Sequence, residues 1–211
     1  MKTVLLVRHG QSTTNLQKVF TGQLDAPLTQ QGKEQAEKMS AFVCKWPVEK
    51  IYVSSLSRAV ETALPIINKL GCPMEKTDAL REIDAGAWQG RTFEEIAGLY
   101  PQSYAVWRSN FADAHPEEGE SCRHLYDRVI KAFTHILQNT PESTVCIVAH
   151  ATPIRMIESY ICAGGPEMSQ DISWVPNASV TIYGYDGEFH LIKRGECGYL
   201  GDNLTNLPTS I

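Results

Sequence analysis

The sequence predicts an α/β protein: a three-layer α/β/α sandwich built on a mostly parallel sheet, with an antiparallel hairpin near the end of the chain. Short apolar, β-branched runs alternate with amphipathic helical segments, which is typical of a parallel sheet covered by helices on both faces. Two runs of alternating polarity, Ser179–Tyr185 and Glu188–Lys193, are joined by Asp186-Gly187, which predicts a hairpin with a two-residue turn. The length of 211 residues fits a single domain over residues 1–211.

The first part of the chain alternates strands and helices. Its strand runs are Thr3–His9, Ile51–Val53 and Met74–Thr77. Thr29 can cap the first helix, whose apolar residues recur every three or four positions and which ends before Pro47. The second helix spans Ser57–Leu70, and Pro65 within it predicts a kink or a new turn.

The middle of the chain interrupts this alternation. From about Gly86 to Glu120 the sequence carries helix and loop signals but no strand, which predicts a cap insertion over a site. Thr92, with Glu95 three residues later, has the spacing of a capping box, and Ser121 can cap a longer amphipathic helix.

The last part of the chain returns to strands. Thr144–His150 is the clearest buried strand, and Thr152-Pro153 predicts a helix start with Pro153 at the first helical position. The hairpin then completes the sheet, and the tail after Gly198 is expected to be a loosely held extension.

Composition excludes several classes of function. Lys and Arg number 19 and Asp and Glu 24, so the net charge is −5 and no basic excess favours nucleic acid or an anionic membrane surface. The apolar run Val4–Val7 is too short for a secretory signal. The six cysteines form no Cys-x-x-Cys pair, and we interpret them as reduced packing residues of a cytoplasmic protein, for which a homodimer stays open.

Two histidines fall at informative places. His9 and His150 each end a predicted parallel strand, at the edge of the sheet where ligands bind in open α/β proteins. Arg8, Arg58 and Glu82 also lie at or just beyond strand ends. If these ends are neighbours, guanidinium groups, an imidazole nucleophile and an acid meet in one pocket, which suits a phosphate monoester.

Each of these signals has a structural alternative. A histidine at a strand end can be a hydrogen-bonded structural residue, Arg58 and Glu61 can form a surface ion pair, and Glu82 can be a solvated carboxylate. A metal site of His9, His150 and Glu82 is conceivable, but no metal-ligand spacing supports it. The remaining histidines are interpreted as structural, and one of them, His115, lies in the cap: His115, His124, His135 and His190.

Several motifs in order resemble one known family. They are Val7-Arg8-His9-Gly10-Gln11-Ser12 with Asn15, Thr21-Gly22 and Leu28-Thr29; then Ser54-Ser55, Ser57-Arg58-Ala59 and Thr62-Ala63; then Leu80-Arg81-Glu82 with Gly86, Trp88 and Gly90; and finally Gly119-Glu120-Ser121 and Val148-Ala149-His150. This set resembles the histidine phosphatase superfamily, the phosphoglycerate mutase-like family of branch 1, over nearly the whole chain. One position departs from the family pattern: Ala151 follows the second histidine, where the family usually has glycine.

The resemblance implies a phosphoglycerate mutase-like fold and a metal-independent phosphatase that works through a phosphohistidine, with no cofactor. By this resemblance His9 attacks phosphorus, Arg8, Arg58 and His150 hold the phosphoryl oxygens, and Glu82 protonates the leaving alkoxide. Repulsion from the phosphate dianion favours the protonated form of Glu82. The residues implied in phosphate or substrate binding are Asn15, Thr21, Gly22 and Ala151.

The same core also serves phosphoglycerate mutases, so the cap has to decide between hydrolysis and phosphoryl transfer. The segment from Arg91 to Arg128 contains four basic and seven acidic residues. This excess of negative charge is unfavourable for binding a polyanionic bisphosphate. We therefore expect hydrolysis of a small-molecule phosphate monoester, with mutase activity or a non-catalytic phospho-ligand-binding protein as alternatives. Six aromatic residues of the cap either line a pocket for a ring-bearing alcohol or pack small helices onto the sheet: Trp88, Phe93, Tyr100, Tyr104, Trp107 and Phe111.

Overall fold

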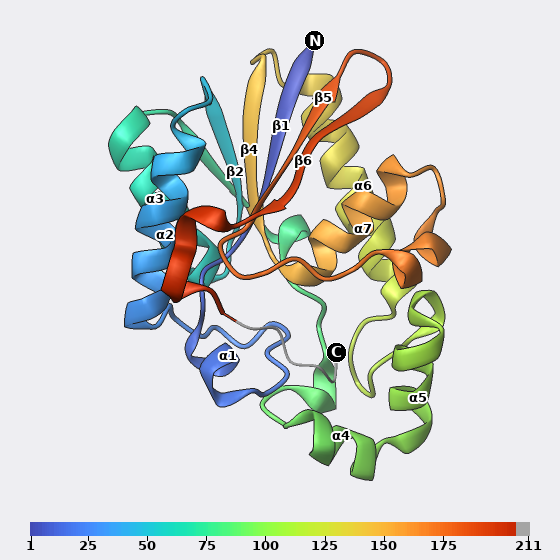
Figure 1. Ribbon diagram of the computed structural model, residues 1–211. Coiled ribbons are helices and arrows are strands. Elements are labelled where there is room, and N and C mark those ends of the chain that lie inside the picture. The colour runs from blue at the N-terminus through green and yellow to red at the C-terminus, as the bar shows by residue number, and fades with distance from the viewer. Residues whose placement is uncertain (206–211) are drawn as a thin grey trace.

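The computed structural model describes residues 1–205 and contains a six-stranded sheet of order β3-β2-β4-β1-β5-β6 (Figure 1). The strands are β1 (Lys2–Arg8), β2 (Lys50–Ser54), β3 (Met74–Thr77), β4 (Thr144–Ala149), β5 (Val180–Tyr185) and β6 (Phe189–Glu196). β1, β2, β3 and β4 pair in parallel, whereas β5 is antiparallel to both of its neighbours. The mostly parallel sheet with a terminal hairpin is confirmed.

Helices cover both faces of this sheet. They are α1 (Thr13–Gln17), α2 (Gln30–Val43), α3 (Ser57–Leu70), α4 (Phe93–Leu99), α5 (Pro101–Ser109), α6 (Cys122–Asn139) and α7 (Ala151–Ile161). Figure 1 shows α2 and α3 on one side of the sheet and α6 and α7 on the other, which confirms the three-layer architecture.

The central strand β1 contributes to two separate hydrophobic cores. Leu5 and Val7 pack in the core that contains residues of α2 and α3, whereas Val4 and Leu6 pack in the core that contains residues of α6 and α7. Successive side chains of a strand point to opposite faces, so one apolar run fills both layers. Because β1 lies between β4 and β5, its register is fixed from both sides.

The elements of the middle segment lie beyond the carboxyl ends of the parallel strands, as α4 and α5 show in Figure 1. Thr92 and Glu95 form the predicted capping box of α4. The described backbone between Gly86 and Glu120 contains helices and turns and no strand.

Local details differ from the sequence expectations at the helix α7 and at the hairpin. Helix α7 begins at Ala151 with His150 as its N-cap, so Pro153 is the third helical residue. This is tolerated because the first four N–H groups of a helix have no partner within it. The hairpin turn contains three residues, since Tyr185 pairs with Phe189, and Gly187 adopts φ +116° there. Helix α3 continues through Pro65 without a break in its assignment.

The expectation of a loose tail after Gly198 is wrong for its first part. A short 3₁₀ helix over Gly198–Asn203 packs against α2, Leu200 is fully buried, and Lys38 of α2 donates a hydrogen bond to its carbonyl at 3.0 Å. The remainder of the predicted tail, residues 206–211, lies outside the described residues.

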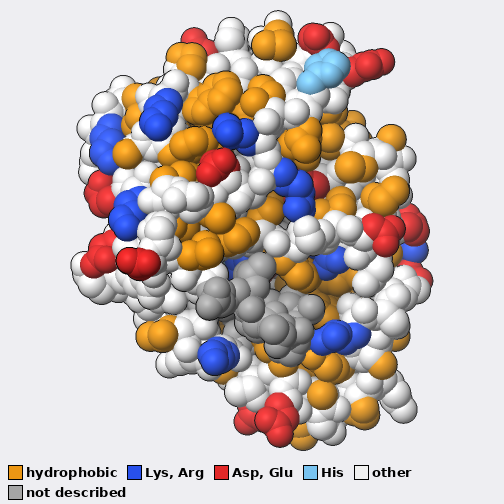
Figure 2. Space-filling model, viewed as in Figure 1, with side chains coloured by type: hydrophobic (Ala, Val, Ile, Leu, Met, Phe, Trp, Pro, Cys, Tyr) orange, Lys and Arg blue, Asp and Glu red, His pale blue; other side chains and the backbone are white. Residues whose placement is uncertain are grey.

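The surface agrees with the mixed composition. On the face drawn in Figure 2, basic and acidic side chains are interspersed rather than gathered in one extended area of a single charge. Within residues 1–205, no helix is both long and apolar enough to cross a membrane.

Candidate active site

The end of strand β1 brings an arginine and a histidine into a buried position. Arg8 is the last residue of β1 and donates a hydrogen bond from Nη1 to the carbonyl of Val175 at 2.5 Å. His9 follows and is held by its backbone, because its N–H donates to Ala149 of β4 and its carbonyl accepts from Ala178. Both side chains are buried at the edge where β1 and β4 end side by side.

The tautomer of His9 follows from the one hydrogen bond that its ring makes within the described part of the chain. Nδ1 lies 2.7 Å from the carbonyl oxygen of Gly10, which can only accept, so Nδ1 carries the hydrogen. Burial, together with the positive charges of Arg58 and Arg8, holds the pKa of His9 well below its usual range. The ring is therefore neutral near pH 7, with the lone pair on Nε2. A neutral imidazole with a free Nε2 is the form that can attack phosphorus.

Arg58 is a site residue and not half of a surface ion pair. It is fully buried on the first turn of α3, and its guanidinium donates to the carbonyls of Gly22 and Leu24, each at 2.8 Å. Burial lowers its pKa to about 10, as it does for Arg8, so both arginines stay charged at neutral pH. The structural alternative for Arg58, an ion pair with Glu61, is wrong.

His150 lies beside His9, with ring centroids 5.0 Å apart. Its Nε2 is 2.7 Å from Oγ of Ser54, the last residue of β2, and Ser54 Oγ also accepts from the N–H of Leu56 at 3.4 Å. The Ser54 hydroxyl can thus donate to Nε2, which leaves the hydrogen of His150 on Nδ1. Burial and the charge of Arg58 lower the pKa of His150 well below its usual range, so this ring is also neutral.

Among residues 1–205, Glu82 supplies the one carboxylate that lines the pocket. Its Oε1 accepts from the N–H of Ile83 at 2.9 Å, and its Oε2 accepts from the N–H of Thr152, in the first turn of α7, at 3.4 Å. The carboxylate faces Arg8 and Arg58 closely enough to raise the pKa of both guanidinium groups against the effect of burial.

The four residues expected to bind phosphate or substrate also line this pocket: Asn15, Thr21, Gly22 and Ala151. Gly22 adopts φ +53°, and a Cβ there would lie 2.4 Å from Oε1 of Gln89, so this position favours glycine. Ala151 is the first residue of α7 and has an ordinary helical backbone, so the conformation at this position does not require glycine. Its backbone N–H lies at the N-terminus of the helix, where N–H groups have no partner within the helix and can bind anions.

The pocket contains residues that the sequence did not single out. It is a cavity of about 570 Å³, and its further lining includes Gln11, Lys18, Phe20, Thr152, Trp174 and Asn177. Asn177 donates to the carbonyl of His9 at 3.0 Å and to Oδ1 of Asn15 at 3.2 Å. It precedes β5, whose start lies beside the carboxyl end of β1 because the two strands are antiparallel, and no local sequence pattern indicates that these strands are neighbours.

Three buried nitrogens of the site have no hydrogen-bond partner among the described residues: Arg8 Nε, Arg58 Nε and His150 Nδ1. Buried donors are nearly always paired, and Arg8 and Arg58 also line the pocket, so these groups can bind the acceptor oxygens of a ligand. With two arginines against one carboxylate, the charge favours an anion such as a phosphoryl group. Among the described residues, no three His, Cys, Asp or Glu side chains gather as metal ligands.

Comparison with known proteins agrees with this geometry. The sequence model of the histidine phosphatase superfamily (branch 1) matches residues 4–196. The chain is 31% identical over 183 residues to phosphoserine phosphatase 1 of Hydrogenobacter thermophilus, covering 86% of each chain. It is 32% identical to a 2,3-bisphosphoglycerate-dependent phosphoglycerate mutase of Cytophaga hutchinsonii, covering 79% of this chain and 80% of the mutase.

A solved structure of the mycobacterial glucosyl-3-phosphoglycerate phosphatase with VO3 superimposes with a TM-score of 0.84 and 26% identity, covering 90% of this chain and 97% of the other. The family match and the phosphatase relatives identify the activity class as phosphoric monoester hydrolysis. The chain therefore belongs to the histidine phosphatase superfamily, branch 1.

Proposed function

We propose that this protein hydrolyses phosphate monoesters of small molecules through a covalent intermediate on His9. One observation carries the proposal: the neutral His9 ring lies among Arg8, Arg58 and His150, and each of these three keeps one buried nitrogen, Nε of the arginines and Nδ1 of His150, without a protein partner among the described residues. His9, Arg8 and Arg58 line one cavity, which thus offers a nucleophile and guanidinium donors for phosphoryl oxygens, and His150 lies directly beside His9.

The reaction then proceeds in two steps at the phosphorus atom. In the first, Nε2 of His9 forms the N–P bond while the P–O bond to the alcohol breaks, and Glu82 gives its proton to the leaving oxygen. In the second, a water attacks phosphorus, Glu82 takes a proton from it, and the N–P bond breaks to release phosphate. The arginines stabilise the charge that the phosphoryl oxygens carry in each transition state, which is the role that metal ions fill in other phosphoryl-transfer enzymes.

The cap favours hydrolysis over mutase activity. None of the four arginines between Arg91 and Arg128 lines the cavity. Arg91 donates to the carbonyl of Ala87, Arg123 pairs with Asp113 and Glu167, and Arg128 pairs with Glu120. A second phosphate, as in a bisphosphate, would therefore find no cation from the cap. The third alternative, a non-catalytic phospho-ligand-binding protein, leaves the free Nε2 of His9 and the carboxyl of Glu82 without a use.

The cavity wall indicates the class of alcohol that leaves. Phe20, Phe93, Trp107 and Trp174 line it, and Trp107 and Phe93 contact Phe20 with ring centroids 5.2 and 5.8 Å apart. Phe93 and Trp107 of the cap therefore line the cavity, whereas Trp88 is fully buried in the core and does not line it. The cap aromatics thus include both pocket-lining and packing residues. We propose substrates whose alcohol carries an apolar or ring-bearing part.

We also make proposals on the domain organisation, the cellular location and the binding partners of the protein. We propose a single domain over residues 1–211, with the segment of about Gly86–Glu120 as its cap, because Phe93 and Trp107 of this segment line the cavity. All six cysteines are free, which supports a cytoplasmic protein. Leu191 and Ile192 are exposed on the edge strand β6, which suggests a homodimer, and light scattering tests this. We also propose that the protein does not bind nucleic acid, which a gel-shift assay tests.

Trapping the intermediate tests the proposed function. The protein is mixed with ³²P-labelled phosphate monoester and quenched in base, in which a nitrogen-linked phosphate survives. We expect label on the peptide that contains Arg8-His9-Gly10, no label and no turnover for His9→Ala, and less of both for His150→Ala with the label still on His9. Label on serine or on His150 would contradict the assignment, and turnover of 3-phosphoglycerate with bisphosphoglycerate would identify a mutase.

A further inference from the structure

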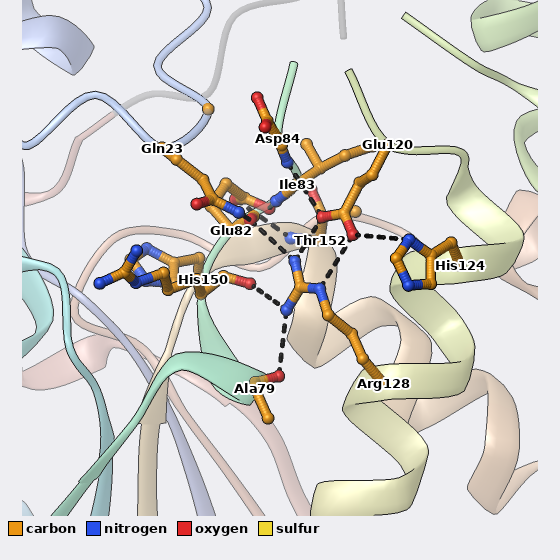
Figure 3. Close-up of polar contacts among 12 residues, drawn as sticks. Gln23, Ala79, Glu82, Ile83, Asp84, Glu120, His124, Arg128, His150 and Thr152 are labelled. Atoms are coloured by element: carbon orange, nitrogen blue, oxygen red, sulfur yellow. Dashed lines mark hydrogen bonds and ion pairs between the residues drawn. The ribbon is translucent and has the colours of Figure 1, made fainter. Parts of the chain in front are cut away.

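Arg128 connects helix α6 to the loop that carries Glu82 (Figure 3). Its guanidinium donates to three backbone carbonyls of this loop, those of Ala79 at 3.0 Å, Arg81 at 2.9 Å and Glu82 at 2.9 Å. The side chain is only 18% exposed. One side chain thus fixes the backbone on the N-terminal side of Glu82.

Glu120 completes the arrangement on the other side of Glu82. Its carboxylate accepts from Nε of Arg128 at 2.9 Å and from Nη2 of Arg128, and its Oε1 also accepts from the N–H of Asp84 at 2.9 Å (Figure 3). The backbone N–H of Glu120 donates to the carbonyl of Asp84 at 2.8 Å. The Arg128–Glu120 pair therefore holds the chain on both sides of Glu82.

The Glu82 carboxyl has no side-chain partner of its own in the described part of the chain. Its two hydrogen bonds come from the backbone N–H groups of Ile83 and Thr152, the second at 3.4 Å. Its orientation therefore depends on where the backbone of the loop is held. A displacement of about 1 Å is enough to lower the rate of an oriented reaction by about 10².

We propose that the Arg128–Glu120 pair is a positioning unit that keeps the Glu82 carboxyl within proton-transfer reach of the leaving oxygen. This inference rests on the proposed function, in which Glu82 is the general acid. A positioning role has a signature that a purely structural role lacks: its loss matters most for leaving groups that need a proton. An alkyl alcohol leaves as a strongly basic alkoxide, whereas p-nitrophenolate leaves without much protonation.

The test compares Arg128→Met with Arg123→Met, a matched control on the same helix. Arg123 is exposed and pairs with Asp113 and Glu167. For each variant kcat/KM is measured with 2-phenylethyl phosphate and with p-nitrophenyl phosphate, since this ratio reports the first phosphoryl transfer. The concentration of competent enzyme is taken from the amount of phosphoenzyme trapped.

For Arg128→Met we expect a loss of about 10² on the alkyl ester and a loss within about threefold on the aryl ester, with the label still on His9. Glu120→Gln should give a smaller loss of the same selectivity, because the amide oxygen can still accept from Asp84 while the charge is removed. Arg128→Lys should restore part of the alkyl rate. Arg123→Met should leave both rates within about twofold of the parent.

Equal losses of Arg128→Met on both esters would overturn the positioning role. Glu82→Gln separates this failure from failure of the proposed function. If Glu82→Gln is selective for the alkyl ester and Arg128→Met is not, the positioning inference alone is wrong. If Glu82→Gln is itself unselective, the acid role of Glu82 is wrong. In the Glu82→Gln background, Arg128→Met should add no further selectivity.

Discussion

The free energy of unfolding should decrease as the pH is lowered, and His9 and His150 should account for a defined part of this decrease. Both rings are buried, and burial with the charge of Arg58 holds their pKa values well below the usual 6.5. The unfolded chain then binds protons more tightly than the folded one, so stability is fully present above pH 6.5 and is lost as the pH falls. While the folded rings stay neutral, each histidine removes about 1.4 kcal/mol between pH 7.5 and 5.5, and the pair removes about 2.7 kcal/mol.

Urea denaturation at pH 7.5, 6.5 and 5.5, in buffers without phosphate, measures this loss. Glutamine cannot take up the proton, so the variant with both His9→Gln and His150→Gln should lack the part of the pH-dependent loss of stability that comes from the two rings. Each single variant should lack about half of that part. His135→Gln, exposed on α6, controls for the substitution itself. If both active-site variants keep the full pH dependence of the parent, the folded rings already bind protons in this range, and a neutral nucleophile is ruled out at pH 5.5.

Three further outcomes are expected. Arg58→Ala should lower kcat/KM by about 10²–10³; because the guanidinium also binds the carbonyls of Gly22 and Leu24, thermal stability should fall too, and a melting temperature below that of the assay would assign the loss to unfolding. Ala151→Gly should change kcat/KM by no more than about twofold, since its backbone is already helical, whereas a tenfold gain would show that the methyl group obstructs the phosphate. EDTA should leave turnover unchanged, because arginine and imidazole groups supply the charge; a loss reversed by zinc or magnesium would contradict this.

The elements with local signals were predictable from sequence. The N-cap Thr29, the capping box at Thr92 and the N-cap Ser121 all begin helices where expected, because a capping side chain satisfies backbone groups within its own turn. The strand ends were also predictable, since parallel strands share the edge at which they finish. That shared edge is enough to bring His9 and Arg58 together in one pocket and to place the ring of His150 against that of His9.

Contacts between distant segments were not predictable in the same way. Leu200 belongs to a segment whose sequence resembles a loose tail, and only its packing against α2 buries it. Ser54 belongs to one of the family motifs, but its role as the partner of His150 depends on β2 lying next to β4. Asn177 binds the carbonyl of His9 only because β5 pairs with β1. The pairing of strands sets these contacts, and no local pattern encodes it.

The place of β1 between β4 and β5 has a consequence for the synthesis of this protein. Val7 pairs with Val148 on one side and with Val180 on the other, so the strand that leads to His9 has no sheet partner until much later parts of the chain have left the ribosome. Such long-range pairing slows folding and leaves apolar strands exposed while they wait. A nascent chain that already contains Arg8, His9, Arg58 and Glu82 therefore still lacks the strands that hold Arg8 and His9 in place. The pocket can assemble only after β4 and β5 have been synthesised.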